Sequence, residues 1–253
     1  MDAEERRLRI LQVTRSTGAV AVAELAARFT VAPETVRRDL RALAEEGLIS
    51  RTHGGARPVE STGSSTPPPS RALRDAPALT RIAAAAVSLL GAAETVFVDE
   101  GFTARLIARA LPRDRPLTVV TASLTAAHAL GDTERITVLL LGGRVRGATL
   151  ATSGGQAARM LGGFVVDLAY LDADGVSREH GLTVFDPAVA EVRAQAVRGS
   201  RRRILAAAAT AFGGVGPCRF ADVRDVEAIV TGAGVPAAEA QRYSLLGPRV
   251  LSV

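Results

Sequence analysis

The sequence predicts an α/β fold in two parts, a small N-terminal helical unit with a hairpin and a larger unit built on a mostly parallel sheet. Residues 20–57 show the pattern of two helices, a tight turn and a hairpin rich in Arg, His and Gly. Residues 58–77 have the Pro- and Ser-rich composition of a linker. From residue 79 onward, continuous apolar runs alternate with helical patterns, which is typical of a parallel sheet covered on both faces.

These shifts in composition place the domain boundaries. We expect a first domain at residues 1–58, a linker at 59–78 and a second domain at 79–253. A chain of 253 residues, of which 47% are hydrophobic, is long enough to bury two cores. All 31 basic residues are Arg, and the net charge of +5 permits a nucleic-acid partner without demanding one.

The composition also excludes several classes of protein. The single cysteine, Cys218, rules out a disulfide within the chain and a cysteine zinc site, and the three histidines do not pair at ligand spacing. We therefore expect no metal and no cofactor. The chain opens with charged residues and has no apolar run of membrane-spanning length, so we expect a cytoplasmic protein without a membrane partner.

The first 32 residues predict two helices and a turn. Residues 2–15 have a helical pattern, with Leu8, Ile10 and Leu11 facing inward and with Arg6, Arg7 and Arg9 towards solvent. Residues 19–22 are expected to form a minimal strand and residues 23–29 a second helix. The turn at 30–32 leads to Pro33, which suits the first position of a new helix because its missing N–H would be unpaired there anyway.

The helix that begins at Pro33 divides into two faces. Val36, Leu40 and Leu43 recur at helical spacing and form a buried stripe. The opposite face and its flank carry Glu34, Thr35, Arg37, Arg38 and Arg41. Taken alone, an Arg-rich helix is more often a solvated face. The preceding short helix, the tight turn and the following hairpin favour a recognition helix, whose arginines contact guanine edges or phosphates in the major groove of double-stranded DNA.

The hairpin at residues 48–57 resembles the wing of a DNA-binding domain. Gly54 and Gly55 are expected to supply the positive φ angles of its turn. Arg51, His53 and Arg57 lie around the tip, where a wing contacts the DNA backbone or the minor groove. A solvated surface histidine is the alternative for His53. The candidate DNA-binding residues are Thr35, Arg37, Arg38, Arg41, Arg51 and His53.

In the second part, strands and helices alternate. The strands are expected at residues 95–98, 117–121, 136–141, 168–171, 204–207 and 228–231. The helices are expected at residues 79–90, 104–111, 123–130, 155–161 and 187–198. Ligands of such sheets bind at the carboxyl ends of the strands. The loops expected there, at 99–103, 121–123, 142–143 and 172–175, combine Gly with hydroxyl or acidic side chains, which suits a phosphate or a polyol. Ordinary strand-to-helix turns prefer the same residues and remain an equal alternative.

At this point the sequence resembles the DeoR family of bacterial transcription regulators. The N-terminal motifs are ELAARF, TVRRDLRALAEEGLI and RTHGGA; the C-terminal ones are VFVDEGFTA, LTVVTASL, LLLGG, LAYLDADGV, HGLT, AEV and AFG. The resemblance implies a winged helix-turn-helix that binds operator DNA. It further implies a sensor domain similar to ribose-5-phosphate isomerase that binds a small effector, often a phosphorylated sugar. Such proteins usually repress carbohydrate-metabolism genes as homo-oligomers, and are not enzymes.

Carried over residue by residue, the resemblance places the helix-turn-helix at Val20 to Asp39. The positions that match the family's effector pocket are Asp99, Gly101, Thr103, Thr121, Ser123, Gly142, Gly143, Asp174, Gly175 and Glu191.

Several residues depart from the family pattern. Thr30 stands for the usual Gly of the turn, and Ala32 for the Ser before Pro33. In the pocket loops, Glu100 and Phe102 replace a Ser and a Thr, Ala122 an Asn, Ala208 an Asp and Ala211 a Lys. An added carboxylate and a lost Lys both weaken anion binding, by about 1.5–3 kcal/mol for each lost charge-assisted hydrogen bond. We therefore expect an effector other than the usual sugar phosphate, or poor binding of one.

Two further functions stay open. The first is a DNA-binding regulator whose sensor domain no longer senses. The second is a sugar-phosphate isomerase with a DNA-binding head, for which Asp174 and Glu191 are too few catalytic groups and no Lys remains to hold a phosphate.

Overall fold

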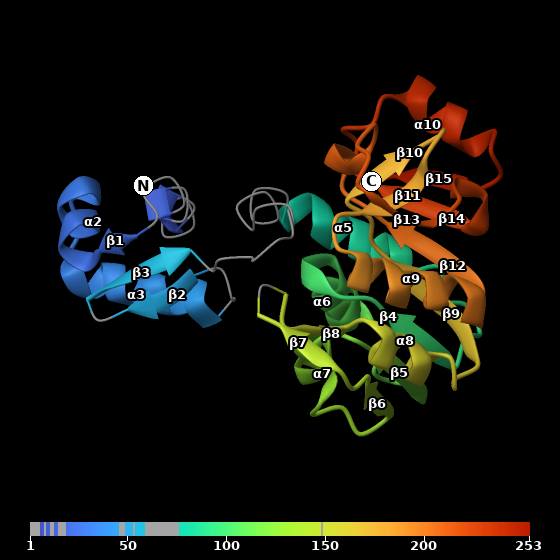
Figure 1. Cartoon of the computed structure of the whole chain (residues 1–253), viewed down its shortest axis with the longest axis horizontal. Helices are drawn as coiled ribbons and strands as arrows, with labels where there is room; N and C mark the ends of the chain where they lie inside the picture. The colour runs from blue at the N-terminus through green and yellow to red at the C-terminus, as the bar shows by residue number, and fades with distance from the viewer. Residues whose placement is uncertain are drawn as a thin grey trace. The chain divides into compact units, whose positions relative to one another are not determined.

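The computed structural model describes residues 6–7, 9–10, 13–14, 19–45, 49–52, 54–58, 76–147 and 149–253. The chain divides into two compact units, and the described part of the second begins at Ala76 (Figure 1). The expectations for Leu8, Leu11, His53 and most of the linker lie outside the described residues. None of the described helices is long and apolar enough to cross a membrane.

The N-terminal unit is a helix pair with a three-stranded antiparallel sheet. Its elements are β1 (Val20–Ala21), α2 (Val22–Phe29), α3 (Pro33–Glu45), β2 (Ile49–Thr52) and β3 (Gly55–Pro58). The strand order is β1-β3-β2, so β3 lies between the minimal strand and the first strand of the hairpin. The predicted stripe of α3 is buried, and its three side chains pack with Ile10, Leu25 and Ile49 in one core. The predicted elements of residues 20–58 are confirmed.

The turn between α2 and α3 holds a side chain in a left-handed conformation. Thr30 has φ 54° and ψ 49°, and Val31 donates its N–H to the carbonyl of Ala26 at 3.1 Å to close the helix. Glycine is the residue that adopts this conformation without steric cost. The departure noted in the sequence therefore falls on a position whose backbone favours Gly.

The two glycines of the hairpin act differently. Gly54 has φ +86°, as the turn requires. Gly55 does not have a positive φ, so the prediction for it is wrong. A Cβ on Gly55 would lie 2.0 Å from the carbonyl oxygen of Val20, because β3 pairs with β1 at this point. Gly55 is thus needed for the close approach of two strands.

An ion cluster ties the N-terminal segment to α3. Arg6 Nε lies 2.6 Å from Asp39 Oδ2, and Arg7 Nε lies 3.2 Å from Asp39 Oδ1. Asp39 is 2% exposed and the Arg6 side chain 11%. The expectation that Arg6 faces solvent is therefore wrong, because the buried carboxylate of Asp39 holds it against α3, while Arg7 contacts the same carboxylate and stays 34% exposed.

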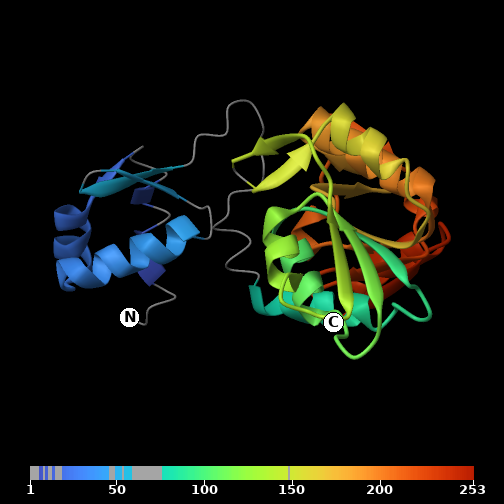
Figure 2. The same ribbon diagram turned by 90° about the horizontal axis from the view of Figure 1, so that it is seen from below.

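The second unit is a doubly wound α/β domain (Figures 1 and 2). Its seven-stranded parallel sheet has the order β15-β14-β12-β9-β4-β5-β6. The strands are β4 (Thr95–Val98), β5 (Leu117–Thr121), β6 (Ile136–Leu140), β9 (Val166–Leu171), β12 (Ser200–Ala206), β14 (Ala228–Thr231) and β15 (Arg249–Ser252). Alternate residues of each strand face opposite layers: Val96 and Val98 pack into one core and Phe97 into the other.

Each face of the sheet has its own cover. One core is closed by α5 (Ala76–Val87), α6 (Gly101–Ala110) and α7 (Leu124–Leu130). The other is closed by α8 (Gly155–Leu161), α9 (Pro187–Gly199), α10 (Ala237–Ser244) and a small sheet of β10 (Gly175–Ser177), β11 (Gly181–Val184) and β13 (Cys218–Ala221). Short 3-10 helices lie at Ala209–Ala211 and Val223–Asp225.

The predicted strands and helices of this unit are present, with ends shifted by up to four residues: β12 begins at Ser200 where residue 204 was predicted. The sequence did not predict β15, α10, the small sheet, or the hairpin of β7 (Arg144–Arg146) and β8 (Ala151–Ser153). These elements are short, and the hairpin strands carry no apolar run that would separate them from loop sequence.

The order of the strands changes direction at β4 and β9. From β4 the chain continues outward through β5 and β6, whereas β9, β12, β14 and β15 extend to the other side. In such sheets the crevice at the carboxyl ends of these two strands is where ligands bind. Here these ends lead into Asp99 and Asp172.

Candidate DNA-binding surface and effector pocket

The exposed face of α3 carries most of the candidate DNA-binding residues. Arg37, Arg38 and Arg41 are exposed and Thr35 is half-buried, while the apolar stripe behind them is at most 1% exposed. Arg51 is exposed on β2, a strand that packs on α3. The structure thus brings five of the six predicted residues into one small unit. The sixth, His53, lies outside the described residues.

Most of these guanidinium groups have no charged partner among the residues that the structure describes in this unit. Among the described residues, Arg38, Arg41 and Arg51 form no ion pair. Arg37 Nη1 lies 3.0 Å from Glu34 Oε2, but both side chains are more than half exposed. Exposed pairs of this kind contribute little, about 0–1 kcal/mol, so Arg37 can leave Glu34 at small cost. The surface offers four cations that a polyanion can bind.

In the second unit, Asp99 joins three elements at the point where the strand order changes. Its Oδ1 accepts the N–H of Glu100 at 2.8 Å, and its Oδ2 accepts the N–H of Asp172 at 3.0 Å. Arg193 Nε, from α9, lies 2.7 Å from the same Oδ2. The carboxylate therefore holds the ends of β4 and β9 and the inner face of α9 together.

A second ion cluster closes the same region. Arg146, on β7, has Nη1 2.5 Å from Glu100 Oε1 and Nε 3.1 Å from Asp186 Oδ2. Thr149, between β7 and β8, lies with Oγ1 3.4 Å from Glu100 Oε2. The hairpin is fixed to the loop after β5, because Thr152 donates its N–H to the carbonyl of Ala122 at 2.8 Å. The hairpin thus packs against the loops at the carboxyl ends of β4 and β5.

Carboxylates dominate the electrostatics of this pocket. Burial raises the pKa of Glu100, against the opposing effect of Arg146. Burial likewise raises the pKa of Asp172 to about 7, although the nearby Arg193 opposes the shift. Burial alone would lower the pKa of Arg193, but the surrounding carboxylates, Asp99 foremost, raise it, so that Arg193 stays charged. Its side chain is 6% exposed, and its buried Nη1 has no hydrogen-bond partner among the described residues.

Some of the predicted pocket residues have structural partners. Thr121 Oγ1 donates to the carbonyl of Val98 at 2.7 Å and accepts the N–H of Ser123 at 3.0 Å. Ser123 Oγ caps α7 by accepting the N–H of Ala126. Asp174 Oδ2 accepts the N–H of Phe185 at 3.1 Å. These bonds shape the loops around the pocket, and contact of these residues with an effector remains a prediction.

The other predicted pocket residues differ in how crowded they are. Gly101 has φ +91° and no heavy atom within 4 Å of where a Cβ would lie. Gly175 has no such space, since a Cβ would lie 2.5 Å from Thr183 Oγ1. Thr103 is buried in the first turn of α6. The remaining three, on the loop after β6 and on α9, are Gly142, Gly143 and Glu191.

The sequence placed two of the site's ionic residues, Glu100 and Asp172, in loops expected at the ligand-binding edge, and identified Glu100 as an added carboxylate. It did not predict the other three, which are Arg146, Asp186 and Arg193. Arg146 lies on a hairpin that was not predicted. Arg193 is 5% exposed on a helix where an Arg is normally expected to face solvent.

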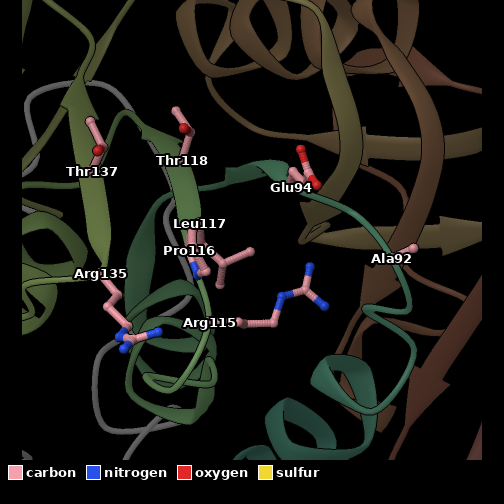
Figure 3. A pocket seen from close by; sticks show the side chains of 8 residues that line it. All are labelled: Ala92, Glu94, Arg115, Pro116, Leu117, Thr118, Arg135 and Thr137. Carbon is pink, nitrogen blue, oxygen red and sulfur yellow. The ribbon is translucent and has the colours of Figure 1, made fainter.

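A shallow hollow of about 470 Å³ lies elsewhere, at the amino ends of β5 and β6 (Figure 3). Its two arginines serve the fold. Arg115 donates to the carbonyl oxygens of Gly91 and Ala93, and Arg135 to that of Asp114. The hollow is thus at the opposite end of the strands from Asp99 and Asp172, and its cations are engaged by backbone.

A helix-turn-helix unit with an exposed cationic helix, joined to an α/β domain with an ionic cluster where the strand order changes, is typical of DNA-binding regulators with a ligand-sensing domain. Comparison with known proteins specifies the class further. A DeoR-like helix-turn-helix domain matches residues 6–62, and a DeoR C terminal sensor domain matches residues 77–233.

Two relatives match along nearly their whole length. The chain is 29% identical over 236 residues to the glycerol-3-phosphate regulon repressor of Escherichia coli (strain K12), covering 93% of each chain. It is 33% identical over 235 residues to the HTH-type transcriptional regulator YgbI of the same strain, covering 92% of this chain and 91% of that one. Among solved structures, ribose 5-phosphate isomerase A of Methanocaldococcus jannaschii aligns over 52% of each chain at 17% identity, with a TM-score of 0.36.

The chain belongs to the DeoR family of transcriptional regulators. This confirms the resemblance seen in the sequence and the expected fold class, a helix-turn-helix unit followed by a parallel-sheet sensor domain. The two relatives are named as a repressor and a transcriptional regulator, which agrees with the expectation that the chain is not an enzyme.

Proposed function

We propose that this protein represses carbohydrate-metabolism genes by binding operator DNA and that a small metabolite in the pocket at β4 and β9 controls this binding. The observation that carries the proposal is the exposed guanidinium face of α3, on which Arg38 and Arg41 form no ion pair with a described residue, backed by a fully buried apolar stripe. The relative named a glycerol-3-phosphate regulon repressor supports the choice of carbohydrate genes.

The proposed DNA contacts follow from the chemistry of the exposed side chains. Arg38, Arg41 and Thr35 would enter the major groove, where Arg binds the O6 and N7 atoms of guanine. Arg37 would contact the flanking backbone. Arg51, with His53 beside it in the sequence, would contact phosphates from the wing, which positions the unit without reading bases. A regulator of chromosomal genes acts in the cytoplasm.

Control by an effector requires two states with different affinities for it. A metabolite shifts the equilibrium only by the difference between its affinities for the DNA-binding state and the released state. The proposed effector contacts are the ten predicted pocket residues together with the ionic groups around them. A homo-oligomer would pair two DNA-binding units, so that the operator contains two half-sites at a spacing of helical turns.

Selection of random DNA fragments by the purified full-length protein tests this proposal. The expected result is enrichment of one sequence with two related half-sites, separated by about 10 bp or a multiple of it. Enrichment of no sequence above the input pool would contradict the proposal. The selected fragment then serves to screen metabolites for release of the DNA.

A further inference from the structure

Glu100 occupies a position at which a bound anion would be expected. It is the residue before α6, and its side chain makes no hydrogen bond to the first turn of that helix. The amino end of a ten-residue helix with an accessible Gly at its first position favours negative charge, since unpaired N–H groups and the helix dipole both point there. Here the chain places a carboxylate of its own beside that end.

The carboxylate of Glu100 engages the cation that a ligand's phosphate would need. Arg146 Nη1 lies 2.5 Å from it, and the two side chains are 10% and 7% exposed. The same guanidinium also holds Asp186, at 3.1 Å from Nε. A phosphate binds Arg through the same paired N–H donors that a carboxylate uses. A phosphate that binds Arg146 through Nη1 or Nε would therefore have to displace a carboxylate from that atom.

The second buried guanidinium, that of Arg193, does not make the site more favourable for a phosphate. Arg193 is held by Asp99 at 2.7 Å and is surrounded further by Asp172 and Asp174. A phosphate ester would add up to two negative charges to a site where carboxylates already outnumber the two guanidinium groups. Hydroxyl groups meet no such repulsion, because they donate to carboxylates, and the unpartnered Nη1 of Arg193 is a donor that a hydroxyl can accept from.

We propose that Glu100 is a built-in anion that occupies Arg146 in place of a ligand's phosphate, so that this pocket excludes phosphorylated effectors and selects polyhydroxylated ones that carry no phosphate. The proposal rests on the effector site described under the proposed function. It assigns to Glu100 the role of a specificity-determining residue.

Calorimetric titration of the full-length protein with glucose 6-phosphate, fructose 1-phosphate and inorganic phosphate tests it. The variants are Glu100→Gln and Glu100→Ser, each of which removes the charge while the second also removes the bulk. Glu94→Gln is the matched control, because Glu94 is an exposed carboxylate at the other end of the strands. The double variant Glu100→Gln/Arg146→Gln asks whether any gained affinity depends on Arg146.

The expected result is that the wild type and the control variant Glu94→Gln bind all three probes weakly or not at all. At least one Glu100 variant should bind a phosphate probe about tenfold or more tightly, and the double variant should lose the gain. Tight binding of a sugar phosphate by the wild type would overturn the proposal. Glu100 variants that bind no better than the wild type, or a double variant that keeps the gain, would overturn it too.

Operator binding by the same proteins separates this proposal from the proposed function. If neither the wild type nor the variants bind selected DNA, the proposed function fails, while the titrations still decide the role of Glu100. If all bind DNA and the Glu100 variants gain no affinity for phosphate, only the present inference fails.

Discussion

The arginines of the N-terminal unit and those of the pocket are in opposite electrostatic situations. Arg38, Arg41 and Arg51 are exposed and form no ion pair with a described residue, whereas Arg146 and Arg193 are buried against carboxylates. An exposed, unpaired guanidinium binds a phosphate or a base edge with little loss of existing contacts. A buried, paired one binds a ligand only by exchanging partners.

The contrast shows that residue type alone does not define a binding site. Arg side chains are available to bind DNA in one unit, and they hold buried carboxylates in place in the other. Both uses occur around α3, since Asp39 of this helix fixes Arg6 and Arg7 of the N-terminal segment, while Arg38, next to Asp39 in the sequence, forms no ion pair with a described residue. The following variants test which charged and turn residues stabilise the fold, and which arginines bind DNA.

The largest effect on stability is expected for Asp39→Ala. It removes the carboxylate that lies 2.6 Å from the largely buried Arg6, and removal of one partner from a buried ion pair costs about 3–5 kcal/mol. Urea unfolding followed by circular dichroism should show a lower midpoint for the N-terminal unit. Glu34→Ala, which breaks only an exposed pair on the same helix, is the control and should cost less than about 1 kcal/mol. Equal losses in both variants would contradict the distinction.

Asp172 should make the stability of the sensor domain depend on pH. Its pKa is about 7 in the folded protein, whereas the ordinary value for an Asp, taken for the unfolded chain, is 3.8. Between these two pH values the folded state binds a proton that the unfolded state has released. The contribution of Asp172 to the free energy of unfolding should therefore be fully present below pH 4. It should be lost as the pH rises through 7, by up to about 1.4 kcal/mol per pH unit.

Asp172→Asn should remove this contribution, so that its unfolding free energy falls less than that of the wild type between pH 5 and pH 8. Asp132→Asn, at an exposed loop position, is the control and should follow the wild type. Parallel pH profiles for all three proteins would show that Asp172 does not hold the proton.

Thr30→Gly should stabilise the N-terminal unit by about 1 kcal/mol, because it removes the steric cost of a left-handed residue with a Cβ. Thr52→Gly is the matched change in an extended strand, where Gly only adds unfolded-state entropy, and it should destabilise. Chemical denaturation of both variants measures the difference. A loss of stability in Thr30→Gly would show that the threonine makes compensating contacts.

A smaller gain, about 0.5–1 kcal/mol, is expected for Ala32→Ser. The carbonyl of Ala32 accepts the N–H of Val36 at 3.3 Å, which makes Ala32 the residue before the first turn of α3, where a hydroxyl can cap an N–H group. Ala42→Ser, in the interior of the same helix, should instead lower stability slightly. No gain for Ala32→Ser would show that its hydroxyl does not reach the first turn.

The N-terminal unit could be predicted from sequence almost completely, because its signals are local. Periodicity placed the stripe of α3, Pro33 marked its start, and Gly54 marked the turn. What could not be predicted there depends on distant pairing: Asp39 with Arg6, and Gly55 with the carbonyl of Val20.

The pocket was less predictable for the same reason. Its edge of the sheet was found, because apolar runs locate the strands and loops follow them. Its ion pairs join residues far apart in sequence, such as Glu100 with Arg146 and Asp99 with Arg193, and no periodic pattern encodes such contacts. The hypothesis that an added carboxylate and a missing Lys weaken anion binding did not include Arg146, whose guanidinium is present in the pocket but already paired.

The central claim is that the unpaired arginines of the N-terminal unit bind DNA, with α3 reading bases and the wing holding the backbone. The most direct measurement is the affinity of Arg38→Ala and Arg51→Ala for the selected operator and for a scrambled sequence, at several salt concentrations. Arg81→Ala, an exposed arginine of α5, controls for the loss of charge.

Arg38→Ala should weaken operator binding by about 1–3 kcal/mol and relax base preference, with a smaller effect on the scrambled sequence. Arg51→Ala should weaken both sequences equally and reduce the slope of log affinity against log salt by about 1. Operator affinity that is unchanged in both variants, at every salt concentration, would contradict the account.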